Sequence, residues 1–171
     1  MKLVHLTKRF FGSLLPVGPS SADTEWALEQ LLPREQELWH RMCAQDRRHA
    51  AGVARRVEGE LGQEATRPIL AAALLHDVGK IDSGLGTPLR VVATLSAAVA
   101  GREMAELWVR STGVTRRIGL YLKHPEIGGD LLGMADSDPL TETWAREHHL
   151  PAEQCTLPTE IADALRRADD D

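Results

Sequence analysis

Residues 67–80 read RPILAAALLHDVGK, and this stretch decides the kind of fold that the chain adopts. Every residue from 69 to 75 is apolar, so the stretch predicts a helix over 68–77 that is apolar all round. A helix of this kind lies in the interior of a protein, where other elements cover it.

The same stretch ends in polar residues that a purely structural helix does not need. His76 and Asp77 follow the apolar run directly, and Lys80 follows Gly79. Neighbouring side chains on a helix point about 100° apart, so His76 and Asp77 cannot both face solvent. Burying an ionised carboxylate costs several kcal/mol unless a positive charge compensates it. Either a metal ion or an ion pair with Lys80 would supply that charge.

Helix signals dominate the rest of the chain, and no alternating strand pattern persists in it. The Pro-, Gly- and Ser-rich segment 16–23 is expected to be a linker, and 84–88 a loop. The sequence therefore predicts an all-α fold. Helices are expected at 3–15, 24–31, 33–62 (continuous or restarting near residue 43), 68–77, 89–99, 102–110, 114–123, 125–133, 139–149 and 158–169.

Composition limits the class of protein. Apolar residues make up 43% of the 171 residues, enough for a real core, and the net charge of −5 argues against a general nucleic-acid binder. The two cysteines, Cys43 and Cys155, lie far apart and favour a reducing compartment. No stretch reaches membrane-spanning length, and Lys8 and Arg9 interrupt what would be a signal peptide. We expect a cytoplasmic protein, with the helix at 3–15 packed on the core rather than on a membrane surface or a partner.

Histidines recur on faces that ought to be apolar. His49 shares a helical face with Met42, Val53 and Val57, where a lone histidine is usually a hydrogen-bonded core residue.

A second histidine signal lies in the segment WAREHHL. His148 shares a face with Leu140 and Trp144, and His149 points about 100° away from it. The helix dipole favours a histidine at a C-terminus, which explains one of the pair better than both. Two adjacent imidazoles can also reach two different metal ions.

The last helix carries one carboxylate on its apolar side. Ile161, Leu165 and Ala168 define that side, and Asp169 falls on it, whereas Asp163 lies on the polar side. Because the two aspartates are six residues apart, about 240° of rotation separates them and only one can face a site between helices. We expect this to be Asp169, although its position near the chain end also fits a frayed terminus.

Each of these residues has a structural explanation of its own, but together they require several coincidences. One metal site explains them all, because neutral imidazoles and carboxylates are the ligands of Fe, Mn, Co and Zn.

The order of these residues resembles the HD superfamily of metal-dependent phosphohydrolases. The segments that carry the resemblance are LLHDVGK (74–80), similar to the namesake motif, HPEIGGDLL (124–132), similar to the histidine segment of the HD-GYP branch, EHH (147–149), similar to its histidine pair, and LRRADDD (165–171), similar to the closing aspartate helix.

The resemblance covers about residues 43–170, so 1–33 is expected to be an N-terminal helical arm and linker and 34–171 an HD domain. It implies a helical bundle with one or two divalent transition metals held between helices, with Asp77 as the bridging ligand. The ligands that it implies are His49, His76, Asp77 and Asp169 for the shared site, and His124, His148 and His149 for a second metal.

The implied activity is cleavage of a phosphoester, in a nucleotide or another small phosphorylated molecule, by a metal-activated water. Asp77 and Lys80 are the expected catalytic residues, with Lys80 on a phosphate oxygen. Selectivity would come from residues 81–123, unless their basic side chains are merely solvated. The basic residues in question are Arg90, Arg116, Arg117 and Lys123.

Two features depart from the HD-GYP pattern. LPAEQC follows His149 in place of a Gly-Tyr-Pro segment, so cyclic di-GMP is not implied, and roughly the first 40 residues resemble no sensor domain.

Two alternatives remain: an HD-fold di-iron oxygenase acting on a small diol or phosphonate, and a non-catalytic metal-binding regulatory module. The adjacent His148 and His149 favour hydrolysis, because the oxygenase needs only one histidine there. The full ligand set argues against the regulatory module.

Overall fold

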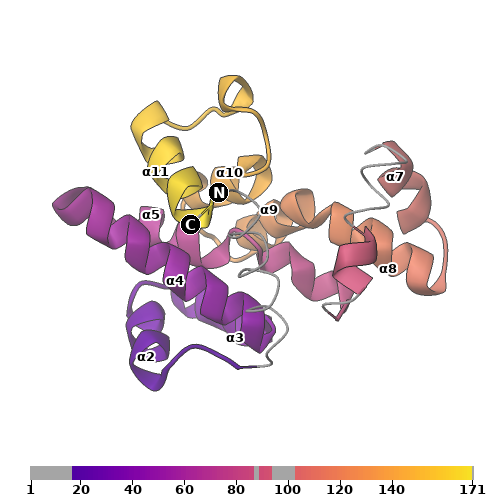
Figure 1. Cartoon of the computed structure of the whole chain (residues 1–171), viewed down its shortest axis with the longest axis horizontal. Helices are drawn as coiled ribbons and strands as arrows, with labels where there is room; N and C mark the ends of the chain where they lie inside the picture. The colour runs from indigo at the N-terminus through magenta and orange to yellow at the C-terminus, as the bar shows by residue number, and fades with distance from the viewer. Residues whose placement is uncertain (1–16, 87–88, 94–102, 171) are drawn as a thin grey trace, which may run out of the picture.

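The computed structural model describes residues 17–86, 89–93 and 103–170, whose course is shown in Figure 1. The predicted all-α class is confirmed, because the regular elements of these residues are all helices. The helix predicted at 3–15 and the end of the one predicted at 89–99 lie outside the described residues. The elements are α2 (Ser21–Glu29), α3 (Pro33–Arg41), α4 (Ala44–Leu61), η1 (Gly62–Glu64), α5 (Arg67–Leu75), η2 (Val78–Ser83), α7 (Glu103–Val109), α8 (Gly113–Leu122), α9 (His124–Met134), α10 (Pro139–Glu147), η3 (Ala152–Gln154) and α11 (Thr159–Asp170).

Helix α5 lies at the centre of the core, as its apolar run predicts. All of its residues from 69 to 75 are buried. Helices α4 and α10 pack against α5, and α11 packs on α4. The core continues across residue 33, because α2 and the turn after it contribute to the same cluster. Members of this cluster include Ala27, Leu31, Trp39, Leu74, Leu75, Leu132 and Leu165.

Helix α2 begins earlier than predicted. It starts at Ser21, inside the segment 16–23 that was expected to be a linker. The hydroxyl oxygen of Ser20 accepts a hydrogen bond from the backbone N–H of Asp23 at 3.0 Å and so caps the helix. The serines of this segment therefore act as a helix start rather than as linker residues.

The region predicted as one or two helices at 33–62 forms two. Helix α3 starts at Pro33, and Met42 interrupts the helical path with an extended backbone (φ −64°, ψ 146°). Helix α4 then runs to Leu61, and Gly62 ends it with a positive φ of 54°, a conformation that favours glycine.

The chain changes its helical form where α5 ends. The helix predicted over 68–77 stops at Leu75, and the chain continues as the 3-10 helix η2. His76 keeps α-helical angles (φ −53°, ψ −35°), whereas Asp77 turns to φ −97°, ψ 7°. Because of this turn the two side chains point to the same place, and His76 Nε2 lies 3.5 Å from Asp77 Oδ2.

Gly79 allows η2 to approach α9 closely. A Cβ atom on Gly79 would lie 2.0 Å from the backbone oxygen of His124 and 2.6 Å from the backbone nitrogen of Gly128. Only glycine therefore lets the first turn of α9, which carries His124, lie against η2. The glycine of the opening stretch is required by this contact and not merely as a helix end.

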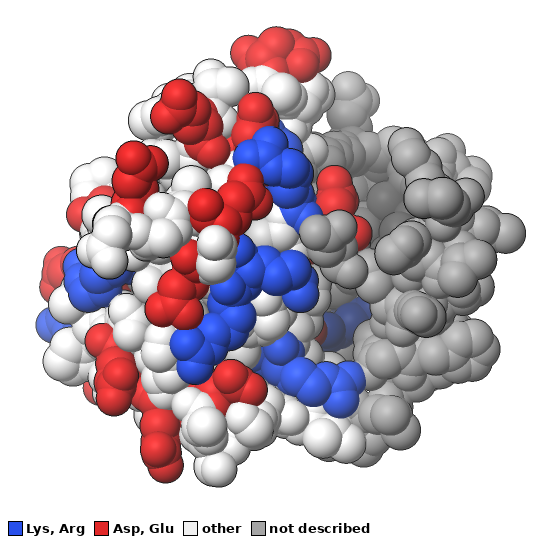
Figure 2. Space-filling view, turned by 60° about the vertical axis from the view of Figure 1, so that its left-hand side comes forward, with Lys and Arg blue, Asp and Glu red and all other residues white. Residues whose placement is uncertain are grey.

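Charges of both signs are mixed on the surface. Figure 2 shows Lys and Arg side chains interspersed with Asp and Glu over one face of the molecule. In the described ranges, none of the helices has the length and apolar character needed to cross a lipid bilayer.

We predict that Gly79→Ala destabilises the protein by about 1–3 kcal/mol or more, because the added methyl group would overlap backbone atoms that no side-chain movement relieves. Denaturant unfolding measures the change. Gly59→Ala in α4 is the control, since a Cβ there meets nothing within 4 Å, and replacing a helical glycine stabilises by roughly 0.5–1 kcal/mol. Equal effects of the two substitutions would contradict the close packing of η2 on α9.

Candidate metal centre

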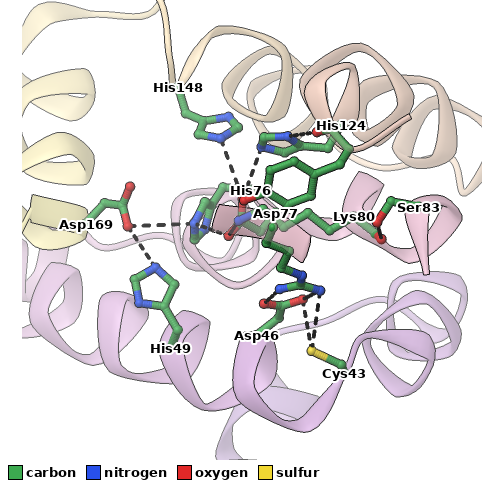
Figure 3. A network of polar contacts seen from close by, with 12 residues as sticks. Cys43, Asp46, His49, His76, Asp77, Lys80, Ser83, His124, His148 and Asp169 are labelled. Atoms are coloured by element: carbon green, nitrogen blue, oxygen red, sulfur yellow. Dashed lines mark hydrogen bonds and ion pairs between the residues drawn. The ribbon is translucent and has the colours of Figure 1, made fainter. Parts of the chain in front are cut away.

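Histidine and aspartate side chains from separate helical segments converge on one place in the structure (Figure 3). These are the residues that the sequence predicts as ligands, and the structure brings all of them together. The contributing segments are α4 with His49, the α5–η2 junction with His76 and Asp77, the start of α9 with His124, the residues after α10 with His148 and His149, and the last turn of α11 with Asp169.

The Asp77 carboxylate lies at the middle of the centre. Its Oδ1 atom is 3.3 Å from His124 Nε2 and 3.8 Å from His148 Nε2. Its Oδ2 atom is 3.5 Å from His76 Nε2 and accepts a hydrogen bond from the Lys80 ammonium. The two oxygens of one carboxylate thus face two different groups of side chains.

Asp169 closes the side of the centre formed by α4 and α11. Its Oδ1 atom is 2.8 Å from His49 Nε2 and 3.8 Å from His76 Nε2. Asp163, the other candidate in this helix, lies 3.5 Å from Arg166 Nη1 instead, with 42% of its side chain exposed. Asp169, on the apolar side of α11, is therefore the aspartate that reaches the centre.

Three histidines are held in the same way by the backbone one turn earlier. The Nδ1 atoms of His76, His124 and His148 lie 2.9, 2.7 and 2.9 Å from the carbonyl oxygens of the residues three positions before them. With Nδ1 donating to a carbonyl, Nε2 of a neutral ring carries the free lone pair. The carbonyls belong to Ala73, Tyr121 and Ala145.

The Nε2 atoms of His124 and His148 are buried and make no hydrogen bond. A buried polar atom without a partner is costly, and such atoms need an explanation. Lone pairs aimed at a carboxylate from fixed rings are what a metal ion requires, and a carbonyl on the other ring nitrogen is the usual support of a metal-binding histidine. The residues present therefore fit a divalent metal.

The ligand atoms form two groups, in each of which all atoms lie within 4.8 Å of one another. Asp77 belongs to the group that contains His49 and His76, and its Oδ2 atom faces His76 Nε2. Its Oδ1 atom faces His124 Nε2 of the other group. Asp169 adds a further carboxylate beside the second group. The groups are His124, His148 and His149, and His49, His76 and Asp77.

The centre has a buried floor and an open rim. The floor is therefore shielded from water, whereas the rim is in contact with solvent. The floor consists of His76, Asp77, His124 and His148, each with a relative exposure of 8% or less. The rim consists of His49, Asp169 and His149, which remain partly or fully exposed.

Burial and the Asp77 charge set the protonation of the histidines. Burial lowers the pKa of His76, but the Asp77 carboxylate outweighs it and raises the pKa to about 9. Burial lowers the pKa of His124, and burial together with the His76 charge lowers that of His148 well below its usual range. Burial and His124 lower the pKa of His149 to about 4. At neutral pH the first ligand group is therefore neutral, whereas His76 holds a proton.

Both carboxylates of the centre are ionised. Burial raises the pKa of Asp77, but Lys80 and His76 outweigh it and hold the pKa well below its usual range. For Asp169, the contact with His49 outweighs burial and lowers the pKa in the same way. Lys80 thus already compensates the buried charge of Asp77, so the ion pair that the sequence suggested as an alternative to metal exists beside the histidines and aspartates of the candidate centre.

Arg90 links two segments of the protein through hydrogen bonds of its side chain. Asp46 accepts two hydrogen bonds from its guanidinium, at 2.6 and 2.8 Å, and the Leu85 carbonyl accepts one from Nε at 2.9 Å. The Arg90 guanidinium also lies 5.9 Å from the ring centre of Tyr121. Arg90 therefore fixes the chain after η2 to α4, so its groups are engaged within the protein rather than directed at a substrate.

Two other basic residues that the sequence suggested for selectivity are also engaged. Arg117 donates from Nε to the Ser83 carbonyl at 2.9 Å, and Lys123 pairs with Glu106. Arg116 is exposed on α8.

Sequence reasoning missed Asp46 and Tyr121. Asp46 lies one turn before His49 on α4 and is buried. Its spacing of three residues from His49 is the sequence signal that could have identified it. Tyr121 orients His124 through its backbone carbonyl, which no side-chain pattern reveals.

Fold and centre together define a helical protein with a candidate metal centre of histidines and aspartates between helices. Comparisons of the chain with protein-family models, with curated proteins and with solved structures found no match.

Metal affinity should rise with pH, because His76 must release its proton before Nε2 can bind a metal. Below the His76 pKa of about 9, release of one proton corresponds to about a tenfold gain in affinity per pH unit. Calorimetric titration of metal-free protein with Mn²⁺ in two buffers of different ionisation heat measures both affinity and proton release. An affinity that stays constant from about pH 6.5 to 8.5 would contradict the protonation of His76.

Asp169→Asn should weaken metal binding by more than the roughly 10–100-fold that loss of an outer-shell partner costs. Asp163→Asn should leave it unchanged, because Asp163 faces Arg166 and solvent. Metal content after dialysis against fixed free Mn²⁺ distinguishes the two variants. Metal loss in Asp163→Asn with retention in Asp169→Asn would show that the last helix is rotated.

Proposed function

We propose that the protein is a metal-dependent phosphohydrolase that cleaves a phosphoester of a nucleotide or another small phosphorylated molecule in the cytoplasm. The observation that carries the proposal is Asp77, a buried carboxylate whose two oxygens face two separate groups of ligand atoms. The resemblance of the ordered histidines and aspartates to the HD superfamily supports the same activity.

The chain offers ligands for two divalent transition metals, of Fe, Mn, Co or Zn. His49, His76, Asp77 and Asp169 would hold one, and His124, His148 and His149 the other, with Asp77 shared. Bound metals of this kind lower the pKa of water and neutralise charge on a phosphoryl group.

The charge of the residues favours an anionic substrate. Asp77 and Asp169 contribute two negative charges, fewer than the positive charges that two divalent ions bring, so the loaded centre attracts a phosphate. Lys80 adds a further positive charge next to Asp77, and only 15% of its side chain is exposed. A buried ammonium placed there is suited to a contact with a phosphoryl oxygen.

The exposed rim is the side from which a substrate would reach the positive charge of the metals and Lys80. His149 is exposed and its ring centre lies 5.2 Å from that of His124, so the second ligand group opens to solvent. A small phosphorylated molecule suits the protein better than a long polyanion, because the chain carries a net charge of −5.

Both histidines of the adjacent pair lie in the centre, with ring centres 4.0 Å apart. This supports hydrolysis over a di-iron oxygenase, which needs only one histidine at this place. Phosphate release by protein reconstituted with Mn²⁺ or Fe²⁺ tests the proposal, on p-nitrophenyl phosphate, its bis-ester, nucleotides and cyclic dinucleotides. Turnover should continue without O₂, and turnover that disappears in anaerobic assays would favour the oxygenase instead.

Replacing Lys80 and replacing Asp77 should have different effects on metal content and phosphate release. Lys80→Ala should retain metal and slow phosphate release by ~10²–10³, the usual cost of an electrostatic contact to the transition state. Asp77→Ala should lose both metal and activity, because it removes the carboxylate that faces both ligand groups. Metal analysis alongside the assay separates the roles, and equal metal loss in both variants would make Lys80 a structural partner of Asp77 only.

A further inference from the structure

We propose that Arg56 is a positioning residue that holds the last turn of α11 on α4 and thereby keeps the Asp169 carboxylate in the metal centre. The inference rests on the proposed metal centre, but it concerns a residue outside the ligand set.

The contact is a hydrogen bond from Arg56 Nε to the carbonyl oxygen of Ala168, at 2.8 Å. Helix α11 ends at Asp170, so the carbonyl of Ala168 is one of the last four, which have no partner within the helix. A cation at this end of a helix also interacts favourably with the helix dipole. Arg56 therefore caps the last turn of α11 from a neighbouring helix.

The cap belongs to a row of contacts along one face of α4. His49, Arg56 and Glu60 are seven and four residues apart, which places them within about 40° of one another around the helix. They meet Asp169, Ala168 and Arg167, three consecutive residues in the last turns of α11. The contacts are His49 Nε2 to Asp169 Oδ1 at 2.8 Å, Arg56 Nε to Ala168 O at 2.8 Å, and Arg167 Nε to Glu60 Oε1 at 3.1 Å.

Apolar packing does not reach the ligand. Leu165 and Ala168 are buried, and Ala168 is the last apolar residue of α11. The ends of helices fray unless they are tied down. The hydrogen bond from the Arg56 side chain to the backbone carbonyl of Ala168, the residue directly before Asp169, holds the helix end where the apolar core stops.

The neighbouring Arg55 provides a matched control. It lies on the same helix, but its guanidinium lies 3.7 Å from the ring centre of Trp26 and pairs with Asp23 and Glu58. Its removal therefore takes the same charge from α4 without touching α11.

The test compares Arg56→Gln with Arg55→Gln, each alone and combined with Asp169→Asn. The affinity for Mn²⁺ is measured by equilibrium dialysis, and amide hydrogen exchange is followed in the last turn of α11. We expect Arg56→Gln to weaken Mn²⁺ binding by roughly 10–100-fold and to speed exchange at the end of α11, and Arg55→Gln to do neither. In the Asp169→Asn background, Arg56→Gln should cause no further loss of affinity, because the two residues act as one unit.

An unchanged affinity in Arg56→Gln, or an equal further loss when Asp169 is already replaced, would overturn the proposal. Arg56→Lys keeps a donor and a charge, so it should recover part of the affinity; if Arg56→Gln does not fold, the exchange and affinity of Arg56→Lys carry the test. Failure of the phosphohydrolase proposal is seen separately, because none of these measurements uses turnover.

Discussion

The structure depends on the compensation of one buried negative charge, that of Asp77. The carboxylate follows an apolar helix into the core, where an ionised group is costly unless positive charge surrounds it. Lys80 and the protonated His76 supply that charge in the protein alone. The remaining neighbours are neutral imidazoles whose lone pairs face the same carboxylate, an arrangement suited to a cation of higher charge.

The fold serves to bring segments distant in sequence to this carboxylate. Helix α5 is buried because residues 69–75 are apolar. Helices α4 and α10 pack on it, α11 packs on α4, and α9 packs on α10 and η2, and these helices and the residues that follow α10 carry the other candidate ligands. The switch to a 3-10 turn aims His76 and Asp77 at one point, and the lack of a side chain at Gly79 brings His124 within reach. Ligand geometry is thus set by backbone contacts as much as by the ligands themselves.

Much of this arrangement follows from the sequence. The all-α class, the central position of residues 69–75 and the choice of Asp169 over Asp163 follow from apolar periodicity, because a buried face leaves a regular pattern. The backbone supports of the histidines, the role of Gly79 and the contact of Arg56 with α11 do not. Each of these features depends on a backbone atom or on a partner from a distant segment. Such contacts cannot be predicted from residue types along the sequence. The early start of α2 at Ser21 was missed because serine serves linkers and helix caps alike.

The most direct test of a metal centre built on Asp77 is anomalous diffraction from crystals grown with saturating Mn²⁺ and measured near the Mn absorption edge. Two peaks are expected, one on each side of the Asp77 carboxylate and about 3.5–4 Å apart, as in other two-metal hydrolases. No anomalous peak at the centre, with Lys80 still bonded to Asp77, would show instead that the buried carboxylate is compensated by the lysine alone.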